Sequence, residues 1–285
     1  MISKKLVKAT FTSLVLVTVL FLNNSSFADK PSDVGKPSIS VEELKKPQTI
    51  KKDGKNIVKF VHIFYKKNIS EKISTEKSYY ISDIETFHHK PGHEGGSGSG
   101  GSGEKCFSFL ANGLKWKITE DFIVNTSNQD GLSETFVNAA VDAAVNEWDS
   151  QVSFDIFGTR IVNNEFNQIG FDGTNVILFG EITDARVIAA VIAFGVAEGK
   201  PNDRQLEEWD MILNDAYITF GDAFDDASVF DLQNIITHEL GHSAGLDHPP
   251  DSCGEETMYR FAQEGETKKR TLNIGDEQGI KRLYR

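Results

Sequence analysis

Three histidines and a glutamate lie within one short stretch of the chain, from His238 to His248, which reads His-Glu-x-x-His-x-x-Gly-x-x-His. On a helix, His238 and His242 are four residues apart and lie on one face, so their imidazoles can share a zinc ion. Glu239 follows the first histidine and can reach a zinc-bound water without being a ligand itself. With His248 as third ligand, one tetrahedral position is left for water, which indicates a catalytic site.

The elements around this stretch must return the third histidine to the first two. A helix is expected from about Leu232 to Ala244, and Gly245 stands where it must end. Glycine adopts the left-handed conformation of such a turn at little cost. The turn would bring His248 back to the metal, and the helix would bury a stripe formed by Ile235, Ile236 and Leu240.

The stretch resembles the zinc-binding consensus of the metzincin metalloproteases, which place a methionine turn shortly after the third histidine. Met258 follows here at a suitable distance, and Tyr259 stands directly after it, as in the matrixins. Arg260 replaces the proline that matrixins usually have next. Residues 272–284 resemble the closing helix of a matrixin catalytic domain. Over about residues 104–285 the chain is therefore similar to a secreted microbial peptidase of the matrixin type.

The resemblance implies an α+β fold of the metzincin (zincin-like) type. Its parts would be a twisted, mostly parallel sheet with an antiparallel edge strand, a backing helix, the active-site helix and a C-terminal helix. It implies one catalytic zinc on His238, His242 and His248, above Met258 as an apolar floor. It also implies hydrolysis of peptide bonds in extended protein or peptide substrates, with Glu239 as general base. The alternative is a zinc-stabilised binding protein without turnover, in which a positioned Glu239 would have no use.

Charge and histidine content narrow the partners and the metals. The net charge of −12 comes from an acidic part after residue 103, whereas the part before it is mildly basic, so nucleic acid is not an expected partner. Of the seven histidines, those after residue 93 all belong to the zinc motif, so a second metal would more plausibly be calcium. An acidic run precedes the zinc helix and consists of Asp222, Asp225, Asp226 and Asp231. Two interpretations of this run stay open, a solvated loop in which Asp231 is the N-cap of the helix, or a calcium site.

Four segments organise the chain. Residues 1–28 have a lysine-rich start, a short apolar core and a small-residue cleavage site before Asp29, which predicts a signal peptide and a secreted, extracellular product without stable membrane association. An uncleaved anchor is the alternative. Residues 29–94 are a candidate propeptide or a spacer. Residues 95–103 are a Gly/Ser linker, native or engineered, and residues 104–285 form the metalloprotease domain.

The N-terminal segment offers two strand candidates, a clear one at residues 57–65 and a weak one at residues 79–81. Matrixin propeptides often silence the enzyme with a cysteine, but residues 29–105 contain none, which excludes that device in its usual form. Three further histidines are interpreted as part of a solvated linker rather than as a metal site: His88, His89 and His93.

Cys106 and Cys253 are the only cysteines. Export permits a disulfide between them, which would join the start of the domain to the loop before Met258. The alternative is Cys106 as a displaced zinc blocker, which would leave the Cys253 thiol unpaired. The mature chain is expected to be a monomer.

Periodicity predicts the remaining elements of the domain. The expected first strand is 114–118, a helix capped by Ser133 is expected to run to about Ser150, and buried strands are expected at 175–180 and 187–194. Residues 211–213 and 217–220 are two further strand candidates. One of them is expected to be the edge strand that pairs with an extended substrate.

Overall fold

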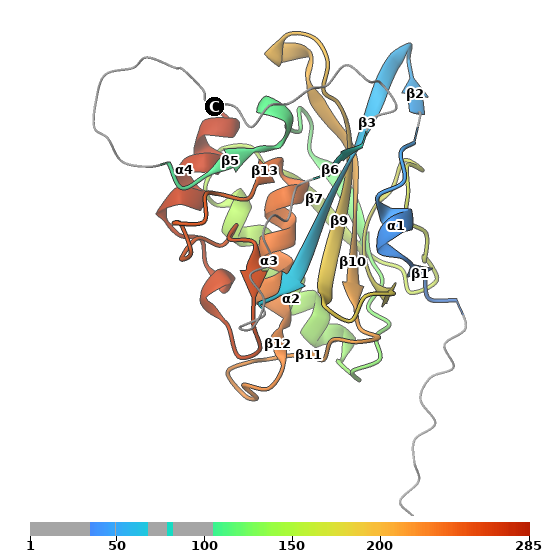
Figure 1. Cartoon of the computed structure of the whole chain (residues 1–285), viewed down its shortest axis with the longest axis vertical. Helices are drawn as coiled ribbons and strands as arrows, with labels where there is room; N and C mark the ends of the chain where they lie inside the picture. Colours follow the sequence, from blue (N-terminus) through green and yellow to red (C-terminus); the bar gives the residue numbers. More distant parts are fainter. Residues whose placement is uncertain (1–34, 49, 68–78, 82–104) are drawn as a thin grey trace, which may run out of the picture. The chain divides into compact units, whose positions relative to one another are not determined.

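A long strand from the N-terminal segment and the strands of the C-terminal domain join into one twisted sheet, and helices cover its faces (Figure 1). This computed structural model describes residues 35–48, 50–67, 79–81 and 105–285. All of them belong to one compact unit, Asp33–Arg285. The expected signal peptide, the Gly/Ser linker and the histidines at 88, 89 and 93 lie outside the described residues.

The sheet runs through seven main strands in the order β14-β3-β9-β10-β8-β6-β7. Their bounds are β3 (Lys55–Lys66), β6 (Glu120–Val124), β7 (Phe157–Val162), β8 (Asn175–Ile182), β9 (Val187–Val196), β10 (Gln205–Asn214) and β14 (Phe261–Ala262). Strands β10, β8, β6 and β7 pair in parallel, whereas β9 pairs antiparallel with β10. A mostly parallel sheet with an antiparallel strand confirms the expected fold class.

Shorter strands extend or accompany this sheet. Three of them belong to the N-terminal segment and pair with β8 or β3: β1 (Ser38–Ile39), β2 (Ile50–Lys52) and β4 (Tyr79–Ile81). Two small sheets lie outside it, formed by β11 (Phe220–Gly221) with β12 (Phe230–Asp231), and by β5 (Ser108–Phe109) with β13 (Leu246–Asp247). The two strands that the sequence indicated in the N-terminal segment are therefore present as β3 and β4.

In the described part of the chain four helices form, each with a cap that the sequence supplies: α1 (Val41–Leu44), α2 (Glu134–Asp149), α3 (Leu232–Ser243) and α4 (Ile274–Leu283). Ser133 caps α2 by accepting a hydrogen bond from the backbone N–H of Phe136, as expected. Trp148 of α2 donates from its indole nitrogen to the backbone oxygen of Thr237 in α3, 2.8 Å away, which ties the backing helix to the metal helix. The described residues also contain three single turns of 3-10 helix, at Leu110–Asn112, Pro201–Asp203 and Lys268–Arg270.

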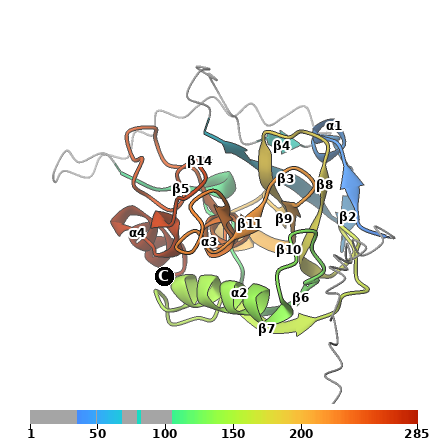
Figure 2. The same ribbon diagram turned by 90° about the horizontal axis from the view of Figure 1, so that it is seen from below.

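The sheet has an apolar core on each face, because alternate residues of a strand point to opposite sides. Helices α2 and α3 bury one face, which we call the inner face, and α1 lies over the other, the outer face (Figure 2). Strand β3 contributes to both cores. Its inner-face residues include Phe60 and Phe64, and its outer-face residues include Val61 and Ile63.

Two strand predictions were wrong. Residues 114–118 join no strand ladder: Leu114 and Trp116 are buried but Ile118 is exposed, and Trp116 donates its backbone N–H to the Tyr284 hydroxyl. Neither candidate for the edge strand is at an edge: residues 211–213 lie in β10 between β9 and β8, and residues 217–219 form no strand. The edge of the domain's own sheet is β9, and β3 is paired to it.

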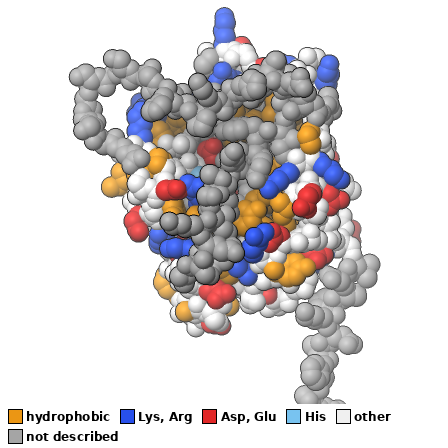
Figure 3. Space-filling view, in the orientation of Figure 1, with side chains coloured by type: hydrophobic (Ala, Val, Ile, Leu, Met, Phe, Trp, Pro, Cys, Tyr) orange, Lys and Arg blue, Asp and Glu red, His pale blue; other side chains and the backbone are white. Residues whose placement is uncertain are grey.

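Within the described residues, no helix reaches the length and apolar character needed to cross a membrane. On the face shown in Figure 3, basic and acidic side chains are mixed over the described part of the surface.

Candidate metal centre

Helix α3 places two of the predicted ligands side by side. Asp231 caps the helix by accepting a hydrogen bond from the backbone N–H of Asn234, 2.9 Å away. Eleven of the twelve helix residues are buried, including His238, Glu239 and His242. The helix is thus held inside the domain, with its two histidines one turn apart on one side.

A sharp turn after α3 returns the third histidine. Gly245 has φ of +100°, and a Cβ atom there would lie 2.2 Å from the backbone oxygen of Leu114, so only glycine fits both the conformation and the space. Strand β13 follows and pairs with β5, after which the chain reaches His248. One potential ligand atom from each of His238, His242 and His248 lies within 4.8 Å of the others.

Backbone carbonyls orient two of the three imidazoles. His238 Nδ1 lies 2.6 Å from the Thr257 oxygen, and His242 Nδ1 lies 3.0 Å from the Leu246 oxygen. A neutral ring that donates from Nδ1 presents the lone pair of Nε2. Burial lowers the pKa of His238, His242 and His248 well below the ordinary value, which favours this neutral form.

The remaining atoms of the centre fit a bound zinc ion. His242 Nε2 and His248 Nε2 face each other at 3.1 Å, and His238 Nε2 is buried without a hydrogen-bond partner among the described residues. Both carboxyl oxygens of Glu239 are likewise buried and without such a partner. Burial raises the pKa of Glu239 well above its ordinary value, so ionisation would need a nearby cation. Three converging imidazole nitrogens are the donor set of a catalytic zinc, and Glu239 with its unpaired carboxyl directly follows the first of these histidines in α3.

Met258 packs on helix α3, which carries two of the three histidines. A Cβ atom on Gly241 would lie 2.1 Å from the Met258 sulfur, which shows how closely the methionine packs on α3. The loop around it is held by α4, because Asp276 accepts hydrogen bonds from the backbone N–H groups of Thr257 (2.7 Å) and Met258 (3.1 Å). The same loop supplies the Thr257 oxygen to His238. The methionine turn therefore connects the C-terminal helix to a ligand histidine.

Lys269 is a functional candidate that sequence reasoning missed. Its ammonium is buried and donates to the backbone oxygens of Glu256 (3.3 Å), Thr257 (3.1 Å) and Tyr259 (2.6 Å), all in the methionine turn. Burial lowers the pKa of Lys269 to about 7. In the sequence it stands within Lys-Lys-Arg, which resembles a solvated basic run, so no local signal distinguishes it.

The two cysteines form a disulfide, with Cα atoms 5.5 Å apart and a separation of 147 positions in sequence. It joins Cys106, at the start of the domain, to Cys253, in the loop between His248 and Met258. The alternative of Cys106 as a displaced zinc blocker is therefore wrong, because its sulfur is already bonded.

The N-terminal segment also contacts the centre, through two residues that sequence reasoning did not assign to it. The His62 ring stacks on the His242 ring with centroids 3.9 Å apart, and the Phe64 ring stacks on the His238 ring at the same distance. Both side chains belong to β3, two residues apart, and so share its inner face. The sequence showed the strand but held no signal for its partner.

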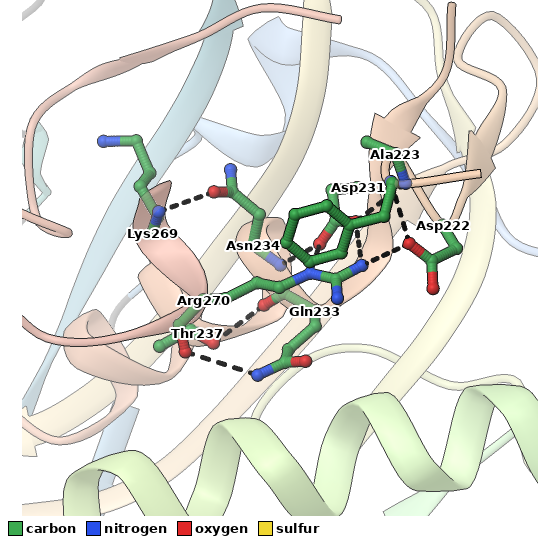
Figure 4. Close-up of polar contacts among 9 residues, drawn as sticks. Asp222, Ala223, Asp231, Gln233, Asn234, Thr237, Lys269 and Arg270 are labelled. Atoms are coloured by element: carbon green, nitrogen blue, oxygen red, sulfur yellow. Dashed lines mark hydrogen bonds and ion pairs between the residues drawn. The ribbon is translucent and has the colours of Figure 1, made fainter. Parts of the chain in front are cut away.

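The acidic run before α3 is organised by an arginine. Arg270 donates to both Asp231 and Asp222, and Asp231 also accepts from the backbone N–H groups of Ala223 (3.0 Å) and Asn234 (Figure 4). The interpretation of Asp231 as a helix cap is thus seen directly. A guanidinium already lies between Asp222 and Asp231, and calcium at this run, which includes Asp225 and Asp226, stays a prediction.

Comparison with known proteins agrees with this geometry. The model of the matrixin family, peptidase family M10, matches residues 114–285, more than half of the chain. No curated protein matches the chain. The matched region contains the histidine cluster and the helix that carries it. The chain therefore belongs to the matrixin family of metalloendopeptidases.

Proposed function

We propose that this matrixin hydrolyses peptide bonds of extended protein substrates outside the cell, with zinc on His238, His242 and His248 and with Glu239 as general base. One observation carries the proposal: Glu239, which directly follows His238 in α3, is fully buried, and neither of its carboxyl oxygens has a hydrogen-bond partner among the described residues. A group buried at such a cost contributes nothing to holding the fold in this arrangement. It is suited to handling a proton of a bound molecule.

Each residue of the centre then has a task. Zinc, when held by the three imidazoles, supplies a Lewis acid that polarises the peptide carbonyl and lowers the pKa of a bound water. Glu239 takes the proton of the attacking water and delivers it to the nitrogen of the leaving amine. The carbonyls of Thr257 and Leu246 keep two ligand rings in one orientation.

Two residues support the ligands without touching the reaction. Met258 forms an apolar floor under the histidines, and Gly245 makes the turn that returns His248. The disulfide between Cys106 and Cys253 holds the loop between Gly245 and Met258 against the start of the domain. It also favours export, because disulfides persist in oxidising compartments. N-terminal sequencing of the exported protein is expected to find Asp29 first, and gel filtration is expected to find a monomer.

The test is cleavage of unfolded casein after limited digestion within residues 29–103, with and without a zinc chelator. Glu239→Ala is compared with Glu277→Ala, which removes an exposed carboxylate paired with Lys281 in α4. We expect Glu239→Ala to keep its zinc and its melting temperature but to lose roughly 100- to 10,000-fold in activity. Glu277→Ala is expected to behave as the wild type.

Two outcomes would contradict the proposal in different ways. Undiminished cleavage by Glu239→Ala would remove Glu239 as the base. Stoichiometric zinc without cleavage by the wild type would favour the alternative, a zinc-stabilised binding protein.

A further inference from the structure

Strand β3 occupies the edge of the domain's sheet next to the metal centre. It pairs antiparallel with β9 over eight residue pairs, from Val58 opposite Gly195 to Tyr65 opposite Val187. Beyond β9 lies β10, so β9 would be an edge strand if β3 were absent. An open edge presents unpaired backbone N–H and C=O groups that bind an extended peptide by strand addition. In this structure a segment of the same chain already has that position.

The side chains of β3 cover the ligand histidines at this edge. His62 lies on the ring of His242 and Phe64 on the ring of His238, each with centroids 3.9 Å apart. Phe64 also packs against the Lys269 ammonium, 5.8 Å from its ring centroid. His62 and Phe64 are each no more than 2 % exposed. An extended substrate paired to β9 in the same direction would need the space that these two side chains fill.

His62 does not bind as a further ligand in this arrangement. Its ring lies flat on His242, with 14° between the planes, and it is not part of the cluster of converging donor atoms. Neither ring nitrogen has a hydrogen-bond partner among the described residues, and the nearest carboxylate, of Asp247, is 3.9 Å from Nδ1. The strand therefore covers the centre sterically.

Further contacts hold the N-terminal segment against the domain. Leu44 of α1 is buried in the outer core, together with Val61 and Ile63 of β3. Lys36 forms an ion pair of 2.6 Å with Asp215, whose side chain is fully buried, and Lys52 pairs with Glu207 at 2.7 Å. Burial of several apolar side chains favours stable docking of the segment.

We propose that β3 is a built-in inhibitor of this peptidase, which occupies the substrate's position on β9 and covers the zinc ligands with His62 and Phe64. The proposal rests on the proposed function of the same centre, and it gives the N-terminal segment the role of a propeptide. No cysteine takes part, because residues 29–105 contain none and Cys106 is bonded to Cys253. An extended substrate gains access to the centre only when β3 leaves β9.

The experiment uses the whole chain from residue 29, loaded with zinc and not digested. A double variant, His62→Ala with Phe64→Ala, removes both side chains that cover the ligand rings. Lys55→Ala is the matched control, since Lys55 is exposed and pairs with Lys52 outside the β9 register. Each protein is measured for hydrolysis of a quenched fluorescent peptide and for affinity toward a fluorescent peptide hydroxamate, a probe that reports access to the zinc without turnover.

We expect the double variant to gain roughly 10-fold or more over the wild type in both measurements, because the loss of a buried aromatic side chain weakens docking of β3. Lys55→Ala is expected to match the wild type. Equal affinity for the hydroxamate in the wild type and the double variant would overturn the inhibitor role. Tight binding that increases in the double variant without any hydrolysis would leave that role intact and contradict the catalytic function instead.

Hydrogen exchange on the unmodified wild type decides the matter if the double variant fails to fold. Saturating hydroxamate must displace β3, so the amides of residues 55–66 are expected to exchange faster when it is bound, while those of β10 stay protected. Failure of the wild type to bind the hydroxamate supports the same conclusion, provided that its zinc is shown to be present. The zinc is measured in a denatured sample and in a sample that has been digested. Binding with unchanged protection of residues 55–66 would contradict the proposal.

Discussion

The two ends of helix α3 differ in whether their buried polar groups have hydrogen-bond partners. At its N-terminal end, the carboxylate of Asp231 accepts hydrogen bonds from two backbone N–H groups and from Arg270. Toward its C-terminal end, both oxygens of Glu239 and the Nε2 atom of His238 are buried and have no hydrogen-bond partner among the described residues. A buried polar group without a partner costs about 1–3 kcal/mol. One end of the helix therefore stabilises the fold, and the other is completed only by a ligand.

The hydrogen bonds at the N-terminal end of α3 offset the free-energy cost of the buried groups without partners toward its C-terminal end. A helix with unpaired donors and acceptors needs other contacts to keep it in place. Asp231 with Arg270 anchors its start, and Trp148 of α2 fixes its middle by donating to the backbone oxygen of Thr237. Substitutions at the paired end should therefore change stability, whereas substitutions at the unpaired end should change chemistry.

The largest expected effect on stability comes from Arg270→Met. It leaves the fully buried Asp231 carboxylate without its cation, and breaking a buried pair in this way costs about 3–5 kcal/mol. Because the Arg270 side chain is 19 % exposed, we expect a loss of about 3 kcal/mol in the free energy of unfolding, measured by urea denaturation. Zinc content and activity per folded molecule should not change.

Arg160→Met is the matched control for this substitution. Arg160 also pairs with a carboxylate, that of Asp142, but the Asp142 side chain is 57 % exposed. Exposed pairs contribute about 0–1 kcal/mol, so the control should lose little stability. Equal losses in the two variants, or lost activity in folded Arg270→Met, would break the division between the two ends.

Lys269 sharpens the comparison, because its ammonium both stabilises the methionine turn and contacts the carbonyl that orients His238. Lys269→Met removes the ammonium that donates to three carbonyls of the methionine turn, one of which, that of Thr257, also orients His238. We expect a loss of about 1–3 kcal/mol in stability. Loss of support for a ligand is also expected to reduce zinc affinity or activity by roughly 10- to 100-fold.

Zinc titration and peptide hydrolysis on Lys269→Met separate the two contributions. Lys268→Met, which removes the neighbouring half-exposed lysine, is the control and should keep both zinc affinity and activity. A variant of Lys269 that loses stability but keeps its zinc affinity and activity would show that the turn does not position His238.

The contrast also marks what sequence reasoning could reach. The ligands His238, His242 and His248 follow from the period of a helix and one turn at Gly245, so local spacing predicts them. The pairing of β3 with β9 joins residues more than a hundred positions apart, and no local pattern reports it. Residues 114–118 show the same limit, since local alternation predicted a strand but the partner of the Trp116 N–H, Tyr284, lies 168 positions further along the chain.

The smallest expected effect is on the pH dependence of stability and concerns Glu208, a buried carboxyl with backbone hydrogen-bond partners and no ion pair among the described residues. Glu208 in β10 accepts hydrogen bonds from the backbone N–H groups of Asp172 (2.8 Å) and Gly173. Burial raises the pKa of Glu208 from 4.5 to about 7. Between these pH values the folded protein binds more protons at this site than the unfolded chain, so the free energy of unfolding falls as pH rises through this window.

Glu208→Gln removes that titration and should flatten the decline. We expect its melting temperature to fall less than that of the wild type between about pH 5 and about pH 8. The exposed Glu277→Gln serves as control and should follow the wild-type profile. Calorimetry at the two pH values measures the difference, and an unchanged slope in Glu208→Gln would mean that backbone N–H groups alone keep a buried carboxylate ionised. In that case an arginine would not be needed at Asp231 either, and the contrast between the two ends of α3 would rest on Glu239 alone.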